Sequence, residues 1–257
     1  MMQNIIQQQL QQIEQKHNIQ IIYACESGSR AWGFASPNSD YDVRFIYLHP
    51  IEKYLAIEPI KNQLTFPITS ELDIHGWDLK KTLQLIHKSN ATPFEWLQSP
   101  IIYQQQTDLA QQLWRLCAHY FNPRGNVHHY LGIASSALQN LHGRQIKIKQ
   151  LFYILRPLLC ACWCIQHKQI APMTITPLLQ LLPADLHKQI LALIDFKNTV
   201  VESHIIEISS NLHDYITTTT NHIKSQIPQL PELNFTATQL DTFFINTLKK
   251  RTSHEHQ

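Results

Sequence analysis

The sequence of 257 residues has few charged side chains and lacks any long apolar run. Asp, Glu, Lys and Arg make up only 16% of it. No stretch of about eighteen consecutive apolar residues occurs, and a helix that crosses a bilayer needs roughly that length. The first residues, MMQN, are polar, whereas a secretory signal is basic and then apolar. We therefore expect a cytoplasmic protein with no membrane partner.

Cysteine occurs at five positions, without a spacing that suits a zinc site. Three of the five alternate at Cys160, Cys162 and Cys164. On a helix, Cys160 and Cys164 share a face and Cys162 points elsewhere, so the three do not converge easily on one metal ion. In the cytoplasm cysteines stay reduced, and we expect these side chains to act as small buried apolar groups.

Acidic residues are absent from residues 110–184. A one-signed segment of this kind predicts a surface that attracts a polyanion or a triphosphate. The alternative is that acidic residues are merely scarce in a chain rich in Gln and Ile, with the basic side chains scattered over several helices. The basic residues of the segment are Arg115, Arg124, Arg144, Lys147, Lys149, Arg156 and Lys168.

Helical periodicity divides the sequence into two parts. Up to about Tyr103 the pattern is mixed, with a helix near residues 2–16 followed by strands and turns. The expected domains are an α/β domain over residues 1–104 and an α-helical bundle over residues 105–257. In the second part, prolines separate helical segments at about 105–120, 125–143, 145–168, 184–197, 203–226 and 236–250.

Asp78 comes directly before a segment with helical spacing. Leu79, Leu83 and Ile86 fall on one side of that segment. An Asp at this place accepts hydrogen bonds from the free amides of the first helical turn. We therefore expect Asp78 to cap the helix and to have first of all a structural role.

A glycine and a serine follow a short apolar strand in the first part. The strand-like run is IIYAC at residues 21–25, after which the sequence predicts a turn into a helix. Gly28 allows the backbone to approach a ligand closely, and the free amides of a helix start attract phosphate. Ser29 adds a hydroxyl donor, and Arg30 lies beside the turn. Gly28, Ser29 and Arg30 are therefore candidate nucleotide-binding residues.

Two carboxylates open the next strand-like segment. Asp40 and Asp42 are two residues apart, so they share one face of a strand. Carboxylates this close repel each other unless a cation lies between them, and Mg²⁺ prefers such oxygen ligands. Arg44 follows on the same face. It can bind phosphate or neutralise the carboxylates as a structural ion pair, and the sequence favours neither.

The combination of these signals is more informative than each one alone. An Asp-x-Asp pair by itself is usually an exposed strand edge, and a Gly-Ser pair is common. Their order after an apolar strand is much rarer by chance and favours a catalytic site. Further along, Leu72 and Ile74 alternate with Glu71, Asp73 and His75, which predicts a half-buried strand with those three polar side chains on one face.

These segments resemble the DNA polymerase β-like nucleotidyltransferase superfamily. The wording GSRAWGFAS at residues 28–36 and DYDVR at residues 40–44 is similar to one branch in particular, the YcgL-type predicted nucleotidyltransferases associated with RNA repair. DIHGWDLKK at residues 73–81 and NATPFEWL at residues 90–97 extend the similarity. It covers about residues 20–105 and, more weakly, residues 149–163.

The resemblance implies an α+β nucleotidyltransferase fold, in which a mixed and largely antiparallel sheet with flanking helices precedes an α-helical bundle. It also implies that Asp73 is a third catalytic carboxylate beside Asp40 and Asp42, with Mg²⁺ or Mn²⁺ as the metal. Glu71 and His75 stay open as alternatives to Asp73 for completing the metal site.

In the helical part, Lys149 and Arg156 match a lysine and an arginine that recur in the branch. They are seven residues apart, which is two helical turns, so they share a face. The resemblance implies that they hold the triphosphate or an acceptor phosphate, because guanidinium groups suit phosphate oxygens. Alternatively, Arg156 pairs with a carboxylate of the first domain, such as Glu95.

The activity that the resemblance implies is transfer of a nucleoside monophosphate from a nucleoside triphosphate (NTP) to an acceptor hydroxyl. An RNA end is the first candidate acceptor, and a protein hydroxyl or a small molecule such as an aminoglycoside are the alternatives. Two non-enzymatic alternatives are a nucleic-acid-binding protein that has lost catalysis and a scaffold in which the helical half is the active part. The identity of the NTP, the acceptor and the oligomeric state stay open.

Overall fold

A computed structural model describes residues 2–68 and 71–254 of the chain. The chain forms two compact units. Unit 1 comprises residues 1–27, 40–120 and 234–257, and unit 2 comprises residues 28–39 and 121–233. Neither unit is a continuous segment of the sequence.

A five-stranded mixed sheet forms the centre of unit 1. Its order is β3 (Gln63–Thr65), β4 (Leu72–Asp78), β2 (Tyr41–Leu48), β1 (Gln20–Glu26) and β5 (Ile102–Gln105). Only the β2–β4 pair is parallel among these strands, and the pairs β1–β2, β1–β5 and β3–β4 are antiparallel. The mixed, largely antiparallel sheet predicted from the sequence is therefore confirmed.

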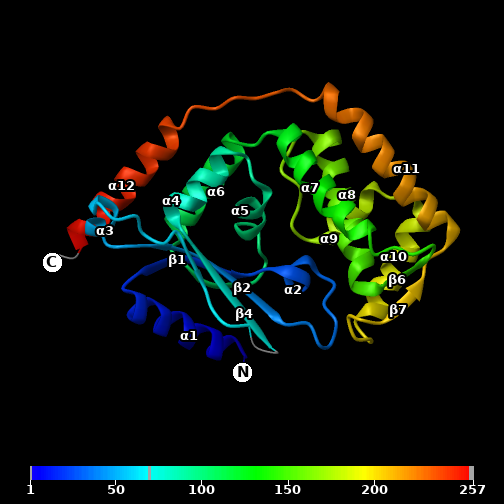
Figure 1. The fold of residues 1–257 in the computed structure, drawn as a ribbon, viewed down its shortest axis with the longest axis horizontal. Helices are drawn as coiled ribbons and strands as arrows, with labels where there is room; N and C mark the ends of the chain where they lie inside the picture. Colours follow the sequence, from blue (N-terminus) through cyan, green and yellow to red (C-terminus); the bar gives the residue numbers. More distant parts are fainter. Residues whose placement is uncertain (1, 69–70, 255–257) are drawn as a thin grey trace. The chain divides into compact units, whose positions relative to one another are not determined.

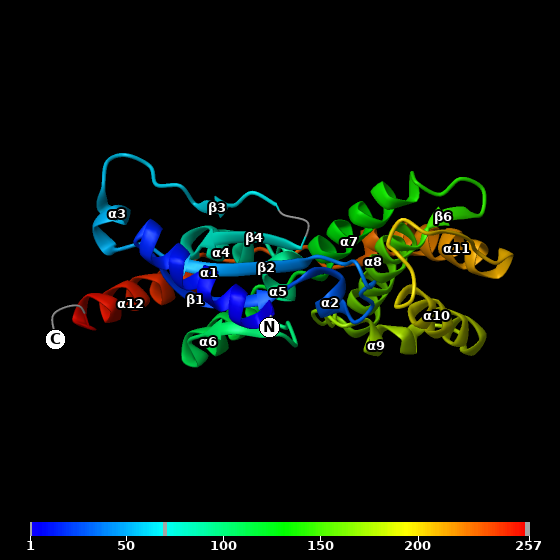
Figure 2. The same cartoon turned by 90° about the horizontal axis from the view of Figure 1, so that it is seen from below.

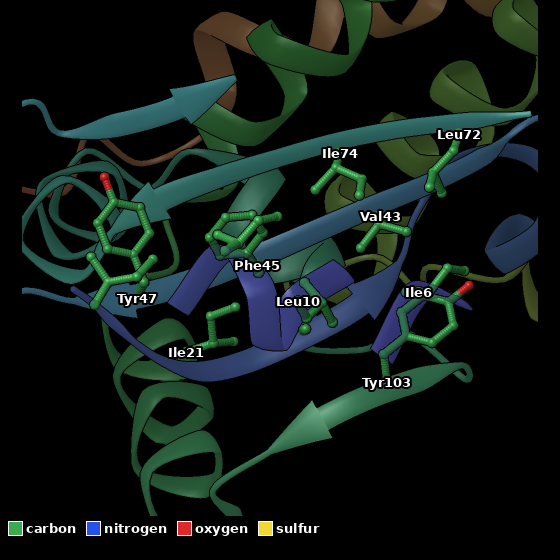
Figure 3. Packing of buried hydrophobic residues seen from close by; sticks show 12 residues of the cluster. Ile6, Leu10, Ile21, Val43, Phe45, Tyr47, Leu72, Ile74 and Tyr103 are labelled. Carbon is green, nitrogen blue, oxygen red and sulfur yellow. The ribbon is translucent and has the colours of Figure 1, made fainter. Parts of the chain in front are cut away.

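Helices cover both faces of this sheet, as Figure 1 shows. Helix α1 (Met2–His17) lies along one face, where Ile6 and Leu10 pack on Val43 and Phe45 of β2 (Figure 3). Because side chains alternate along a strand, Asp42 and Arg44 point to the opposite face. That face carries helices α4 (Leu79–His87), α5 (Ala91–Trp96) and α6 (Thr107–His119).

Strand β4 follows the predicted alternation. Leu72 and Ile74 are buried in the core against α1, whereas Asp73 and His75 are half-buried on the other face. The chain then enters α4 at Asp78, which is 1% exposed and whose carboxylate accepts a hydrogen bond from the Lys80 amide at 2.8 Å. The prediction that Asp78 is a helix N-cap is confirmed. Strand β3 pairs with β4 on the side away from β2, and a short helix, α3 (Ile51–Leu55), precedes β3 in the sequence.

The last helix, α12 (Thr238–His254), belongs to unit 1. The segment before it is fixed by Phe235, whose ring lies 5.3 Å from the ring of Tyr120 and whose carbonyl is 2.9 Å from Nε2 of His87. The Tyr120 hydroxyl donates to the Thr236 carbonyl at 2.7 Å. The division therefore differs from the expected boundary at residues 104 and 105, because α6 and α12 complete unit 1.

Unit 2 is helical apart from one small two-stranded sheet. Helices α7 (Pro123–Leu138) and α8 (Ile148–His167) lie side by side in Figures 1 and 2. The sheet pairs β6 (Gln145–Lys147) with β7 (Ile205–Glu207), which lies inside the helix expected at 203–226. The remaining elements are α2 (Gly28–Trp32), α9 (Ile175–Leu178), η1 (Leu179–Leu181), α10 (Ala184–Lys197), α11 (Ser210–Gln226) and η2 (Ile227–Gln229).

Helix α8 is the most apolar helix of unit 2. By length and composition it is the one helix among the described residues that could cross a membrane, although 67% of its apolar window is buried inside the protein. A core helix passes the same test. Cys160 and Cys164 are buried on it and Cys162 is half-buried.

Candidate active site

Asp42 and Asp73 are direct partners in the parallel pairing of β2 with β4. Both follow an alternation that buries their apolar neighbours against α1, so both carboxylates project from the same face of the sheet. Their side chains are 22% and 20% exposed. The pairing therefore brings together two of the carboxylates that the sequence identified.

The guanidinium of Arg44 bridges these two carboxylates. Its Nη2 donates to Asp42 Oδ1 at 2.8 Å and to Asp73 Oδ2 at 2.7 Å. Its Nη1 donates to the backbone carbonyls of Asp73 at 2.9 Å and Val43 at 3.1 Å. The structure thus shows the ion-pair alternative for Arg44, since the positive charge offsets the repulsion between the neighbouring carboxylates.

Asp40 lies just outside strand β2, which begins at Tyr41. The Tyr41 amide donates to the Glu71 carbonyl at 2.8 Å, which fixes the chain next to β4. Glu71 itself is exposed, and Asp40 is half-buried. Within residues 2–68 and 71–254 no three His, Cys, Asp or Glu side chains are grouped closely enough to hold a metal ion. Asp42 and Asp73 converge on a cation and fit a divalent ion by donor type, and a place for Asp40 beside them stays a prediction.

Glu26 is a site residue that sequence reasoning missed. It ends β1, is 0% exposed, and its Oε1 accepts a hydrogen bond from the Asp42 amide at 2.9 Å. Its Oε2 accepts a hydrogen bond from the Tyr103 hydroxyl. The Ser27 amide donates to the Asp42 carbonyl at 2.8 Å, so the Asp42 backbone is held on both sides. The signal in the sequence for Glu26 was a carboxylate that directly follows the apolar run at residues 21–25.

His75 lies two residues beyond Asp73 on β4. Burial, the Arg44 guanidinium and the Lys81 ammonium lower the pKa of His75 from its usual value of 6.5, although the Asp73 carboxylate opposes them. Its Nδ1 lies 3.1 Å from the Thr65 hydroxyl oxygen of β3. The two nearby cations and burial therefore disfavour the charged form of this imidazole.

The predicted phosphate turn, Gly28 to Arg30, lies in unit 2. Gly28 has φ 62°, a left-handed value that a glycine adopts without strain, and it begins the five-residue helix α2. The Ser29 hydroxyl donates to Ser39 Oγ at 3.1 Å, and Arg30 Nη2 donates to the Ser39 carbonyl at 2.5 Å. The segment 28–39 is therefore closed on itself by Ser39.

Glu202 ties this segment to helix α8 within unit 2. The Ser39 hydroxyl donates to Glu202 Oε1 at 2.7 Å, and Lys149 Nζ lies 2.5 Å from Glu202 Oε2. Burial raises the pKa of Glu202, but the hydrogen bonds from Lys149 and Ser39 outweigh it, so the net pKa lies below the usual 4.5. The residue predicted at position 149 to hold phosphate thus pairs with a carboxylate that the sequence did not suggest.

Arg156 is placed differently from the expectation. It is 3% exposed, and its Nε and Nη2 donate to the Met173 carbonyl at 3.1 and 2.9 Å. The guanidinium also lies 4.5 Å from the centre of the Trp32 ring. These contacts hold α8, residue 173 and α2 together inside unit 2. A buried guanidinium engaged in this way stabilises unit 2, and its role as a phosphate ligand stays a prediction.

Three basic residues of the acid-free segment have acidic partners. Acidic residues from later in the chain pair with three of its basic residues, which the sequence order concealed. Arg115 belongs to unit 1, and the other basic residues of the segment belong to unit 2. The pairs are Arg124 with Glu232 at 3.4 Å, Arg144 with Glu207 at 2.5 Å and Lys149 with Glu202 at 2.5 Å.

The fold and the paired carboxylates of unit 1 define a nucleotidyltransferase of the DNA polymerase β type, and sequence comparison gives the same class. The family described as RlaP, the RNA repair pathway DNA polymerase beta family, matches residues 2–246. The chain belongs to this family, and it is a nucleotidyltransferase. It is 39% identical over 254 residues to the uncharacterized protein YcgL of Bacillus subtilis (strain 168), with 97% of both chains covered.

Two solved structures are more distant matches. Spectinomycin adenyltransferase AAD(9) from Enterococcus faecialis, determined with ATP and spectinomycin, has a TM-score of 0.39 and 14% identity, and the match covers 84% of this chain and 96% of that one. A nucleotidyltransferase-like protein from Exiguobacterium sibiricum has a TM-score of 0.30 and 10% identity, over 95% of this chain and 73% of that one.

Proposed function

We propose that this nucleotidyltransferase is metal-dependent and transfers a nucleoside monophosphate from an NTP to the hydroxyl of an RNA end. The observation that carries the proposal is that Asp42 and Asp73, on the paired strands β2 and β4, converge on one cation, the Arg44 guanidinium. The family description, which names an RNA repair pathway, supports RNA as the acceptor.

The reaction is an in-line displacement. The acceptor hydroxyl oxygen bonds to the α-phosphorus of the NTP, the bond from that phosphorus to the pyrophosphate oxygen breaks, and the hydroxyl proton is lost. A divalent ion, Mg²⁺ or Mn²⁺, would neutralise the phosphate oxygens and lower the pKa of the attacking hydroxyl. We propose Asp40, Asp42 and Asp73 as the carboxylates that hold it.

The chain's own residues have distinct tasks in this proposal. Glu26 fixes the Asp42 backbone through its amide, so the carboxylate is held in place before substrate arrives. Within unit 2, Gly28 and Ser29 are proposed to bind phosphate with a backbone amide and a hydroxyl, with Arg30 as a cation beside them. Lys149 of the same unit is proposed to bind phosphate as a point charge once Glu202 releases it.

Transfer of label tests the proposal. The full chain is incubated with each α-labelled NTP in turn, with Mg²⁺ or Mn²⁺, and with total cell RNA or protein. We expect label on RNA, and we expect Asp42→Asn to lose it by about 100-fold or more, as for other groups on which charge stabilisation depends. The matched control is Asp108→Asn, since Asp108 is an exposed acid on α6 of the same unit.

Other outcomes separate the alternatives. Label on protein or on a small molecule identifies a different acceptor and overturns the RNA part alone. Transfer that survives Asp42→Asn overturns the proposed site. A gel shift with RNA in rising salt adds an independent readout, because releasing counterions from the phosphates gains less free energy as the salt concentration rises.

A further inference from the structure

Arg44 occupies the point on which Asp42 and Asp73 converge. One nitrogen, Nη2, lies 2.8 Å from an oxygen of the first carboxylate and 2.7 Å from an oxygen of the second. The guanidinium group of arginine is a permanent cation in proteins. In this structure one of the two negative charges of the carboxylate pair is therefore already offset by a cation of the chain itself.

A divalent ion cannot bind between the same two oxygens while the guanidinium remains. Mg²⁺ needs oxygen ligands at about 2.0 to 2.1 Å in near-octahedral geometry, and a cationic nitrogen at that point excludes it by both volume and charge. Metal binding at Asp42 and Asp73 therefore requires Arg44 to leave.

The surroundings allow that movement. The side chain of Arg44 is 17% exposed, so it is not locked in the core. Its other anchors are the backbone carbonyls of Val43 and Asp73, which belong to the strand pair β2 and β4 and accept only single hydrogen bonds from it. Once released, the guanidinium presents paired donors of the kind that suit phosphate oxygens.

We propose that Arg44 is an exchangeable cation: it holds Asp42 and Asp73 in the metal-free protein and is displaced when a divalent ion binds there. This inference rests on the proposed function only in taking Asp42 and Asp73 as metal ligands. The two alternatives for Arg44 in the sequence, ion pair and phosphate ligand, then become two successive states of one side chain. Binding of metal and of triphosphate is cooperative, because each favours the released state.

Direct metal binding tests this. Mn²⁺ affinity of the full chain is measured by calorimetry or by the free-ion electron paramagnetic resonance signal, for the native protein and for Arg44→Gln. Removing the competing charge should tighten Mn²⁺ binding by about tenfold, as expected for one unit charge a few ångströms from the ion. The matched control is Lys81→Gln, which removes a cation of the same unit that lies 5.0 Å from the Trp77 ring and pairs with Gln63.

Thermal unfolding gives a second readout. In the presence of a chelator Arg44→Gln should unfold at a lower temperature than the native protein, since two adjacent carboxylates are left without their cation. Added Mn²⁺ should then raise the unfolding temperature of the variant more than that of the native protein. Lys81→Gln should show neither effect.

Arg44→Lys covers the case in which the glutamine variant does not fold. An ammonium keeps the charge but cannot donate to both carboxylates and both carbonyls, so Mn²⁺ should bind more tightly than to the native protein and less tightly than to Arg44→Gln. Equal or weaker Mn²⁺ binding in the Arg44 variants overturns the exchange. Loss of Mn²⁺ binding from Arg44→Gln on adding Asp42→Asn supports it, whatever the transfer assay gives, so the two proposals fail separately.

Discussion

The Phe45 ring fills the space beside Gly76 on the neighbouring strand. The two residues are partners in the β2–β4 pairing, and a Cβ built on Gly76 would lie 2.2 Å from Cε2 and Cζ of that ring. Figure 3 shows Phe45 within the cluster that packs on α1. Packing therefore requires glycine at position 76, on the same strand as Asp73.

Gly76→Ala should destabilise the protein by about 1 to 3 kcal/mol, because the added methyl group overpacks the core against Phe45. The free energy of unfolding in urea measures this. Phe45→Leu removes the ring, so the double variant should lose less stability than the sum of the single changes. Additive losses would show that Phe45 is not the obstacle.

Glu26→Ala should destabilise unit 1 by about 1 to 3 kcal/mol, because the Asp42 amide and the Tyr103 hydroxyl lose their acceptor in a buried place. Glu26→Gln keeps an acceptor for the Asp42 amide and should lose less. Urea unfolding followed by circular dichroism separates the two. If Glu26→Ala unfolds at the native urea concentration, the carboxylate does not hold Asp42.

Unit 2 should become less stable as the pH is lowered below 4.5. The pKa of Glu202 is lower in the folded protein than the usual 4.5, so its contribution is present above that value and is lost as pH falls through the folded pKa. Glu202→Gln removes the titrating group and should flatten this part of the profile. Thermal unfolding between pH 3 and 7 measures it, and an unchanged profile in Glu202→Gln would contradict the assignment.

Arg156→Lys should destabilise unit 2 by about 1 to 3 kcal/mol, because an ammonium cannot make both hydrogen bonds to Met173 and stack on Trp32. The matched control is Arg144→Lys, whose ion pair with Glu207 is largely exposed and should change stability by less than about 0.5 kcal/mol. Urea unfolding gives both values. Native-like stability of Arg156→Lys together with weakened triphosphate binding would instead support the prediction that Arg156 binds phosphate.

The local structure around the carboxylates could be predicted from the sequence because it depends on short-range patterns. Alternation over residues 71–75 gave the buried and exposed sides of β4, and Asp78 gave the start of α4. The short strand β7 was not predicted because Ile205–Glu207 forms a strand by pairing with residues 145–147, which are distant in the sequence. Its separation from α11 is marked by Ser209, whose hydroxyl caps that helix through the Leu212 amide at 3.2 Å.

Partners distant in sequence set the remaining features. Arg44 bridges Asp42 and Asp73 only because β4 pairs parallel to β2, a register that no local pattern encodes. Glu202 pairs with Lys149 and Ser39, which are 53 and 163 residues away, so neither pair could be inferred from spacing. The acidic partners of Arg124, Arg144 and Lys149 were not predicted for the same reason, since they come from residues 202–232.

Because α12 completes unit 1, the order of synthesis matters for folding. The strands that carry Asp42 and Asp73 leave the ribosome early, yet Tyr120 and His87 receive Phe235 and Thr236 only after all of unit 2 has been translated. Unit 1 therefore remains incompletely packed while unit 2 is synthesised. During this period its exposed apolar surface favours aggregation and chaperone binding. A fragment of residues 106–257 would contain α6 and α12 without the sheet of unit 1, to which these helices belong, so it would not isolate the helical unit.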